Sequence, residues 1–267
     1  MDLIVVGQWM QITMLKNIGK TFENVGLQMT NGWWNCIAEC DLDSDGDMDY
    51  VVGNLGLNSR IKATDLHPAF VVANDFDNNG STDAVMSIFF GDKSYPIHQR
   101  DQLLDQVRDL RKKYLRYESY SNATIYDIFP KQKVDSSLVL LSKNFATSIV
   151  ENLGNGSFKM TPLPIEAQFS PTNGIVCRDF NNDGKIDILL AGNSYAPEIE
   201  TGRYDAGTGL LLIGNGKTGF SPVKIKESGF FADKNVQSMK MLLSAKTGKE
   251  LILVGNNNDR LQLFRKR

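Results

Sequence analysis

The sequence predicts an all-β protein with a small helical insertion, organised as a β-propeller of four-stranded antiparallel blades. Three observations predict this fold class. An acidic loop between two β-prone runs occurs three times, further short β-prone runs follow, and glycine is frequent, with 23 in the chain. Four short strands per unit, repeated around an axis, are typical of propeller blades. We expect about five blade equivalents, as a fragment of a larger propeller, at residues 2–28, 33–66, 70–162, 173–228 and 235–267.

Composition narrows the functional classes. The 267 residues are 42% hydrophobic, which is enough apolar material for one large core. The 29 lysines and arginines face 31 acidic residues, so no nucleic-acid partner is expected. No apolar run approaches the roughly 18 residues of a transmembrane helix. The three cysteines are expected to fill the core, since Cys36 and Cys40 lie roughly 13 Å apart on one strand, too far for a disulfide.

The acidic loops share the pattern D-x-[DN]-x-[DN]-G-x-x-D, and three copies are hard to obtain by chance. Positions 1, 3, 5, 7 and 9 are the candidate metal ligands, with position 7 acting through its backbone carbonyl. These candidates are Asp41, Asp43, Asp45, Asp47 and Asp49 in loop one, Asp75, Asp77, Asn79, Ser81 and Asp83 in loop two, and Asp179, Asn181, Asp183, Lys185 and Asp187 in loop three.

Calcium suits this chemistry because it takes several oxygen ligands at about 2.3–2.6 Å. Glycine at position 6 permits the sharp turn by adopting a positive φ. We expect two or three Ca²⁺ ions, bound most tightly by loop one, although oxygen ligands also suit other hard cations. An EF-hand is excluded because position 12 is Val52, Met86 or Leu190 instead of glutamate. The alternative is an ordinary Asp/Asn/Gly turn without an ion.

Two half-copies of the repeat occur at the ends of the chain. Asp2 precedes residues 3–7 as Asp187 precedes residues 188–192, so Asp2 takes the place of a loop's last ligand. Residues 250–256 repeat the second strand without an acidic loop. The sequence therefore indicates the C-terminal part of a longer propeller, with the upstream part of the same protein as a partner.

Residues 96–130 interrupt the β pattern as a helical insertion within a single propeller region, 1–267. A second, shorter helix is predicted at residues 122–129. The first helix is predicted from apolar residues at helical spacing, namely Leu103, Val107, Leu110 and Tyr114. It also carries a basic cluster, either a solvated face or a site for an anionic partner, formed by Arg108, Arg111, Lys112, Lys113 and Arg116.

The loops and the Gly-x-Gly-x-Phe strand at residues 154–158 resemble FG-GAP/VCBS repeats, as in the propeller of integrin α-chains. Residues 34–58, the insertion, and residues 162–171 and 202–206 are similar to bacterial FG-GAP proteins related to cartilage acidic protein. Those proteins often carry an ASPIC/UnbV domain, which is not recognisable in this chain. The resemblance implies a calcium-stabilised propeller on an exported or surface-exposed bacterial protein, with ions that brace the structure and do not catalyse.

The leading hypothesis is a non-catalytic calcium-binding propeller that serves as a binding or scaffold module for a protein or glycan. Such loops bind calcium at about 10⁻⁴–10⁻³ M, which favours an extracellular, cell-surface or periplasmic location. Trp33 and Trp34 are interpreted as packing or as a binding platform. A second hypothesis is purely structural completion of a larger propeller. A third is a polysaccharide-active enzyme with a carboxylate pair in the polar cluster of Glu198, Glu200, Arg203, Tyr204 and Asp205.

Overall fold

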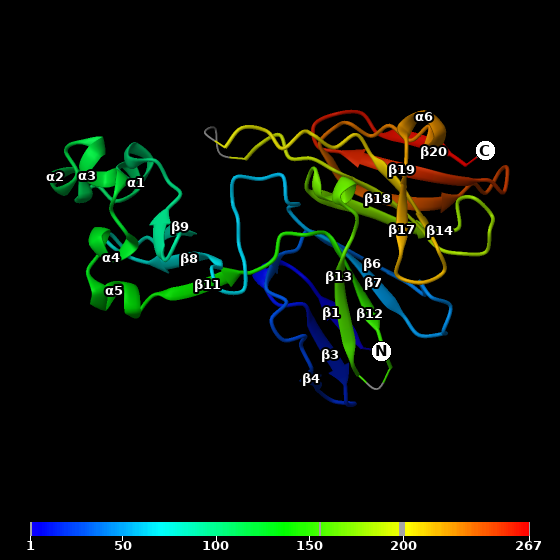
Figure 1. Cartoon of the computed structure of the whole chain (residues 1–267), viewed down its shortest axis with the longest axis horizontal. Coiled ribbons are helices and arrows are strands. Elements are labelled where there is room, and N and C mark those ends of the chain that lie inside the picture. Colours follow the sequence, from blue (N-terminus) through cyan, green and yellow to red (C-terminus); the bar gives the residue numbers. More distant parts are fainter. Residues whose placement is uncertain (1, 155, 198–200, 267) are drawn as a thin grey trace.

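The computed structural model of the chain describes residues 2–154, 156–197 and 201–266. The protein is mostly β, with several small antiparallel sheets, three of them four-stranded, and a short helical stretch (Figure 1). The all-β class, the four-stranded sheets and the helical stretch are therefore confirmed. Closure of the sheets into a ring is not seen among the described residues.

In two sheets the acidic loop joins the strand at one edge to the strand beside it. The first contains, in spatial order, β6 (Cys36–Cys40), β7 (Asp49–Gly53), β12 (Ser148–Asn152) and β13 (Phe158–Pro162). The second contains β14 (Thr172–Arg178), β15 (Asp187–Gly192), β16 (Leu210–Gly214) and β17 (Phe220–Val223). Every residue of β15 is buried, because neighbouring sheets cover both of its faces. An apolar run rather than a polar–apolar alternation is typical of such a strand.

The first sheet differs from the predicted blade at residues 33–66. Its third strand comes from far along the chain, because β12 pairs with β7 and brings Ser148 opposite Val52. The sheet is therefore completed by residues 148–162, which the sequence had assigned to the blade at residues 70–162. Everything between β7 and β12 is inserted into this sheet.

The inserted part forms its own sheet, in the order β10 (Lys93–Pro96), β9 (Asp83–Phe90), β8 (Ala69–Asn74) and β11 (Leu138–Ser142). Here the strand after the helices pairs with β8, the first strand of the hairpin, and not with β9. The second acidic loop thus belongs to a sheet with a different strand order from the other two. Figure 1 shows this sheet and its helices at one end of the molecule.

The helices of the insertion are short and extend beyond the predicted end at residue 130. They are α1 (Arg100–Gln106), α2 (Leu110–Lys113), α3 (Tyr117–Ser121), α4 (Ile125–Ile128) and α5 (Lys131–Asp135). The single helix predicted through Leu103 and Tyr114 is wrong, because the helix stops after Gln106 and restarts at Leu110. Its predicted apolar side chains are nevertheless buried in one cluster with Phe76 and Phe129.

Three smaller sheets and one further helix make up the rest of the described structure. One sheet contains β1 (Leu3–Val5), β3 (Thr13–Asn17) and β4 (Phe22–Asn24), and a two-stranded sheet contains β2 (Gln8–Met10) and β5 (Gly32–Trp33). The third contains β18 (Val236–Leu243), β19 (Glu250–Asn256) and β20 (Gln262–Arg265). The helix is α6 (Ile225–Ser228), and a 3₁₀ turn, η1, covers Ile165–Gln168.

The first strands of three sheets lie side by side, because β14 packs between β6 and β18. Apolar side chains fill the space between these sheets in two clusters, one around Val51 and Ile188 and one around Leu189 and Val254. The three cysteines are free and half-buried, and they pack against the first of these clusters. The prediction that Cys36 and Cys40 fill the core is therefore confirmed in part, since both pack against the core cluster but stay half-buried.

Candidate metal sites

The three acidic loops share one backbone conformation. Position 6 is a glycine at positive φ in each loop, at Gly46 (95°), Gly80 (86°) and Gly184 (83°), as the turn chemistry predicts. Position 4 also has a positive φ, which the pattern alone did not reveal. The residues there are Ser44, Asn78 and Asn182, with φ between 58° and 63°. Asparagine adopts this conformation more readily than most residues do, because its short side chain bonds locally.

The last aspartate of each loop ties the loop to its sheet. Oδ2 accepts a hydrogen bond from the backbone N–H at position 2, at 2.9 Å for Asp49, 3.0 Å for Asp83 and 2.8 Å for Asp187. All three carboxylates are almost fully buried. Such bonds fix the carboxylate and close the loop across seven residues.

The same aspartate also holds the third strand of the sheet. Oδ1 of Asp49 accepts from Asn152 N at 2.8 Å, and Oδ1 of Asp187 accepts from Gly214 N at 2.9 Å. Asp2, the half-copy at the start of the chain, accepts from Asn17 N at 2.8 Å in the same register. Asp2 therefore stands in the structural position of a last loop residue, as the sequence predicts.

Two aspartate triads could hold metal ions. Asp41, Asp43 and Asp49 bring carboxylate oxygens within 4.8 Å of one another, and so do the corresponding aspartates 75, 77 and 83 of loop two. Oδ1 of Asp41 is buried without a hydrogen-bond partner, as is Oδ1 of Asp47. A buried anionic oxygen without a donor is costly unless a cation neutralises it. The residues of loop one thus fit a hard cation.

Positions 5 and 7 are not part of these triads. The side-chain oxygen at position 5 accepts from the backbone N–H at position 7, at 3.0 Å in loop one, 2.7 Å in loop two and 2.9 Å in loop three. The residues that pair in this way are Asp45 with Asp47, Asn79 with Ser81, and Asp183 with Lys185. In loops one and two the structure therefore brings together the aspartates at positions 1, 3 and 9, and in all three loops the side chain at position 5 also stabilises the turn.

Loop three has one carboxylate fewer at the centre, because its position 3 is an amide. Asn181 donates through Nδ2 to Asp183 at 3.1 Å. Both oxygens of Asp179 accept backbone N–H bonds, from Asn182 at 2.6 Å and from Gly184 at 2.9 Å. Asp179 is thus better satisfied by the protein itself than Asp41 is, and a cation would gain less from it.

The carboxylates of a triad titrate differently. Burial raises the pKa of Asp49, and the charges of Asp43 and Asp45 add to this. Burial likewise raises the pKa of Asp83. The backbone N–H of Gly80 lowers the pKa of Asp75. Without a cation, the buried last aspartate is therefore the member of each triad whose charge is disfavoured.

A pH dependence follows for Asp49. The pKa of Asp49 in the folded protein lies above the ordinary 3.8. Below pH 3.8 the carboxyl group is mostly protonated in both the folded and the unfolded state, so it does not change the free energy of unfolding. As the pH rises from there through the raised pKa, the buried carboxylate becomes charged in the folded state at a cost, and the free energy of unfolding falls. In chelator, wild type should therefore lose stability relative to Asp49→Asn as the pH rises above the ordinary aspartate value of 3.8. Urea unfolding at several pH values measures this difference. An equal difference at every pH would contradict it, and Asp65→Asn, at an exposed site outside the loops, is the matched control.

Two lysines that the pattern did not identify hold the loops from outside. Nζ of Lys133, in α5, donates to the carbonyls of Asp75 and Phe76 at 2.9 and 3.0 Å and to Asn78 Oδ1 at 2.8 Å. Nζ of Lys266 makes the equivalent bonds in loop three, to the carbonyl of Asp179 and to Asn182 Oδ1. Both ammonium groups bind the main chain and leave the carboxylate cluster open. Neither lysine has a fixed sequence distance to its loop, so no local signal could have found them.

The polar cluster of the enzyme hypothesis is only partly described. Glu198 and Glu200 lie outside the described residues. Arg203 is exposed and lies with its guanidinium 4.9 Å from the ring centre of Tyr195. Tyr204 pairs with Ser194 in an isolated β-bridge, and Asp205 is exposed. The described part of this cluster thus contains a single carboxylate and no carboxylate pair.

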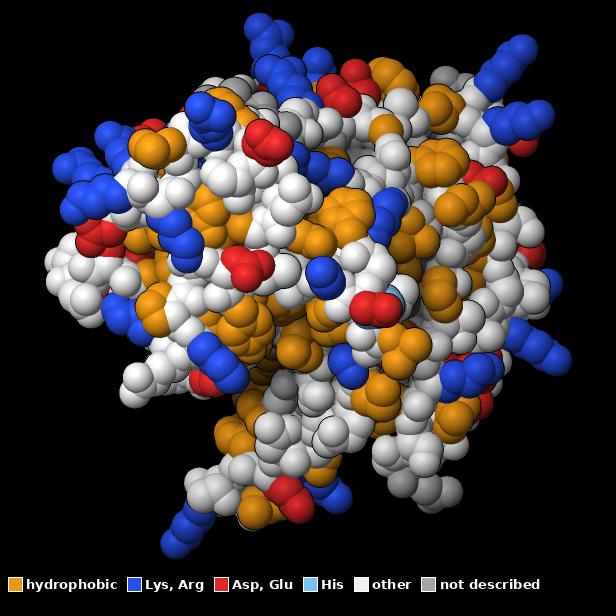
Figure 2. Space-filling view, turned by 60° about the vertical axis from the view of Figure 1, so that its left-hand side comes forward, with side chains coloured by type: hydrophobic (Ala, Val, Ile, Leu, Met, Phe, Trp, Pro, Cys, Tyr) orange, Lys and Arg blue, Asp and Glu red, His pale blue; other side chains and the backbone are white. Residues whose placement is uncertain are grey.

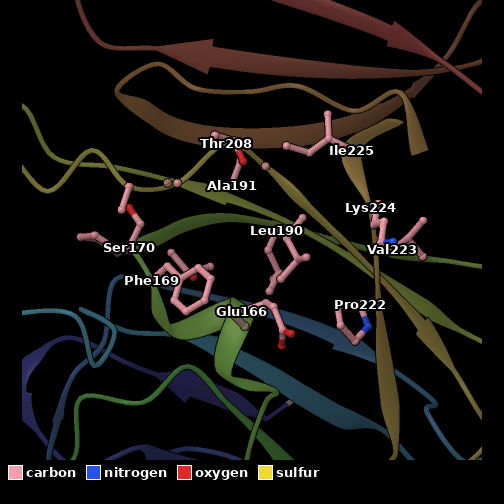
Figure 3. A pocket seen from close by; sticks show the side chains of 18 residues that line it. Glu166, Phe169, Ser170, Leu190, Ala191, Thr208, Pro222, Val223, Lys224 and Ile225 are labelled. Atoms are coloured by element: carbon pink, nitrogen blue, oxygen red, sulfur yellow. The ribbon is translucent and has the colours of Figure 1, made fainter. Parts of the chain in front are cut away.

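One cavity of about 440 Å³ lies next to η1. Figure 3 shows Glu166 and Phe169 on one side, Leu190 near the middle, and Pro222 and Val223 across from them. Its lining is mainly apolar, with a carboxylate and Lys224 at its edges. No acidic loop contributes to it.

The basic cluster of the insertion is exposed and partly neutralised. Arg111 pairs with Asp105 and Lys112 with Asp109, while Lys113 donates to the carbonyl of Asp127. This arrangement favours the solvated-face interpretation over a site for an anionic partner.

Comparisons with known proteins do not identify the chain. No protein-family model matches it, and no curated protein was found to be similar.

Proposed function

We propose that the chain is a calcium-stabilised, non-catalytic β-sheet module of the FG-GAP/VCBS type that binds a protein or glycan on an exported bacterial protein. The observation that carries the proposal is the aspartate triad of loop one, in which a buried Asp41 oxygen has no donor. A bound Ca²⁺ would supply the missing positive charge and join the two strands of the hairpin to the rest of the sheet. Asp41, Asp43 and Asp49 would hold it, and their counterparts in loop two would hold a second ion.

The β-propeller is the architecture we propose for the intact assembly. Its support is the side-by-side packing of β6, β14 and β18, each of which is the first strand of its sheet. β7 pairs with the first strand β6, and β15 pairs with the first strand β14. β1, which corresponds to β7 and β15 in the repeat, pairs only with β3 among the described residues. A further strand paired with β1 would complete its sheet as a four-stranded blade.

Exported location is proposed from calcium affinity. Loops of this kind bind at about 10⁻⁴–10⁻³ M, so only calcium outside the cytosol would fill them. Within the described residues, no helix has the length and apolar character that a bilayer-spanning segment requires.

Removal of calcium should lower the melting temperature. At about 1 mM calcium and a Kd of about 10⁻⁴ M, each occupied site adds about 1.4 kcal/mol. Two sites add about 3 kcal/mol, which corresponds to about 6–12 °C for a chain of this size. Thermal unfolding followed by circular dichroism, in calcium and in chelator, measures the shift.

The control for this melt is the double variant Asp43→Ala/Asp77→Ala, which removes one ligand side chain from each triad. It should melt at nearly the same temperature in calcium and in chelator. Wild-type protein that melts equally in both conditions would contradict the proposal.

A further inference from the structure

A second cavity, of about 460 Å³, lies where the first strands of the sheets begin. Asn35 precedes β6, while Asn173 and Gln237 are the second residues of β14 and β18, and all three line this cavity. The acidic loops leave β6 and β14 at their other ends, roughly 15 Å away along a five-residue strand. The cavity therefore lies at the opposite ends of β6 and β14 from loops one and three.

β-bulges place two of these amides. In the pairing of β14 with β15, Thr172 lies opposite Gly192 and Gly174 opposite Ala191, so Asn173 is the extra residue. In the pairing of β18 with β19, Gln237 is extra in the same way. An extra residue leaves the ladder and turns its side chain in a new direction, and bulges often occur beside functional sites.

A third bulge lies at the same cavity. It is at Trp9, between Gln8 and Met10 of β2. Trp9 has a φ of 63°, a strained value for a bulky residue, and its ring lies 5.1 Å from that of Trp33. Gln8 and Trp33 both line the cavity. Strain and irregular pairing are thus concentrated around this opening.

The described lining combines amide and hydroxyl side chains with apolar ones, and its described residues include no acidic side chain, lysine or arginine. His98 also lines the cavity, and its Nε2 accepts a bond from Met86 N at 3.1 Å. Asn173 donates its amide to the carbonyls of Asn193 and Val236 at 3.1 and 2.9 Å. These bonds fix the side chain, and no donor among the described residues bonds to its Oδ1. Tyr204 and Trp33 add aromatic surface.

We propose that this cavity binds a carbohydrate. Amide side chains both donate and accept hydrogen bonds, which matches sugar hydroxyl groups, while the C–H face of a pyranose packs on an aromatic ring. The volume lies within the range of small-molecule sites, about 300–1,000 Å³. The inference rests on the proposed function and names the ligand class and the site.

In Figure 2 hydrophobic side chains gather in a hollow near the middle of the view, and charged side chains lie both beside this hollow and at the periphery. The 440 Å³ cavity beside η1 is a weaker candidate, because its lining combines apolar side chains with Glu166 and Lys224 and lacks such a group of amides.

Tryptophan fluorescence tests the inference. Of the three tryptophans, Trp33 lines the cavity, Trp9 packs on it, and Trp34 is buried elsewhere. Calcium-loaded protein would be titrated with glucose, galactose, N-acetylglucosamine, maltose and cellobiose, each up to about 100 mM, and with glucuronic acid as the charged comparison. At least one sugar should change the emission with saturation, and calorimetry should give the same Kd.

The variant that tests the site is Gln237→Ala. Gln237 is exposed, and its amide bonds only to the neighbouring Asn235 among the described residues, so the fold should be retained. Loss of one hydrogen bond should weaken sugar binding by about 3- to 10-fold. The control Gln132→Ala, on the exposed surface of α5, should leave the Kd unchanged.

Two results would overturn the inference. One is a folded wild-type protein without a saturable response to any of the sugars, and the other is an unchanged Kd in Gln237→Ala. A calcium melt of the same sample separates this failure from failure of the proposed function. Protein that is stabilised by calcium but does not bind sugars would refute the carbohydrate site alone.

Discussion

Asp49→Ala is expected to destabilise the protein by about 2–4 kcal/mol in chelator and by about 3.5–5.5 kcal/mol in calcium. The carboxylate is fully buried and accepts from Leu42 N and Asn152 N. Its removal leaves two buried N–H groups without acceptors, each at a cost of about 1–3 kcal/mol, partly offset by the loss of a buried charge. The further loss in calcium is the binding free energy of the first loop. Urea unfolding in both buffers measures the two contributions.

Asp41→Ala is the matched comparison. Asp41 belongs to the same triad, but its only hydrogen bond in the described structure is a long one of 3.3 Å from Gly46 N. The Asp41→Ala variant should lose the part of the free energy of unfolding that calcium binding to loop one contributes, and its stability in chelator should be close to that of wild type. If both variants were equally stable in chelator, the structural role assigned to Asp49 would be wrong.

Asn193→Ala is expected to cost about 3–5 kcal/mol with or without calcium. Asn193 is fully buried and has a φ of 114°. Its amide donates to the carbonyls of Gly207, Asp233 and Lys234, and its Oδ1 accepts from Ser170 Oγ and Gly207 N. It thus joins the end of β15 to three other chain segments, at Ser170, at Gly207 and at residues 233–234. Chemical unfolding of the variant in calcium and in chelator measures the cost.

The control for this position is Asn193→Gly. Glycine tolerates the positive φ but supplies no amide, so this variant should be about 1 kcal/mol more stable than the alanine variant and still well below wild type. Wild-type stability in either variant would show that the buried network contributes nothing.

The hairpins could be predicted from the sequence because the information is local. Each acidic loop joins two β-prone runs within about twenty residues, and the loop itself fixes the turn through glycine 46, 80 or 184. The strand that completes the first sheet could not be predicted in this way. Its pairing of Val52 with Ser148 spans the entire insertion, and no local pattern specifies a partner at that distance.

The insertion shows a second limit. Helical spacing identified the buried side chains correctly, including Leu103 and Leu110. It did not show that the backbone leaves the helix at Val107, because the same side chains reach the core from one helix or from two short ones. Spacing therefore predicts which face is buried better than it predicts helix continuity.

For the candidate metal sites, the pattern identified the aspartates that come together but not the residues that hold them in place. Positions 1, 3 and 9 converge in loops one and two. The supporting contacts of Lys133 and Lys266 come from elements far along the chain. The repeated Gly-Asn after the second strand, as at Asn54 and Asn193, was visible in the sequence, and its burial gives that repeat a structural role.

The central claim is that the aspartate triads bind calcium, and a metal count tests it most directly. Chelator-treated protein would be dialysed against about 1 mM calcium, and the bound metal would be counted per chain by elemental analysis. Wild type should retain two or three ions, and Asp43→Ala and Asp77→Ala should each retain one fewer. Folded wild-type protein with no calcium above the buffer level, or variants with an unchanged count, would contradict the claim.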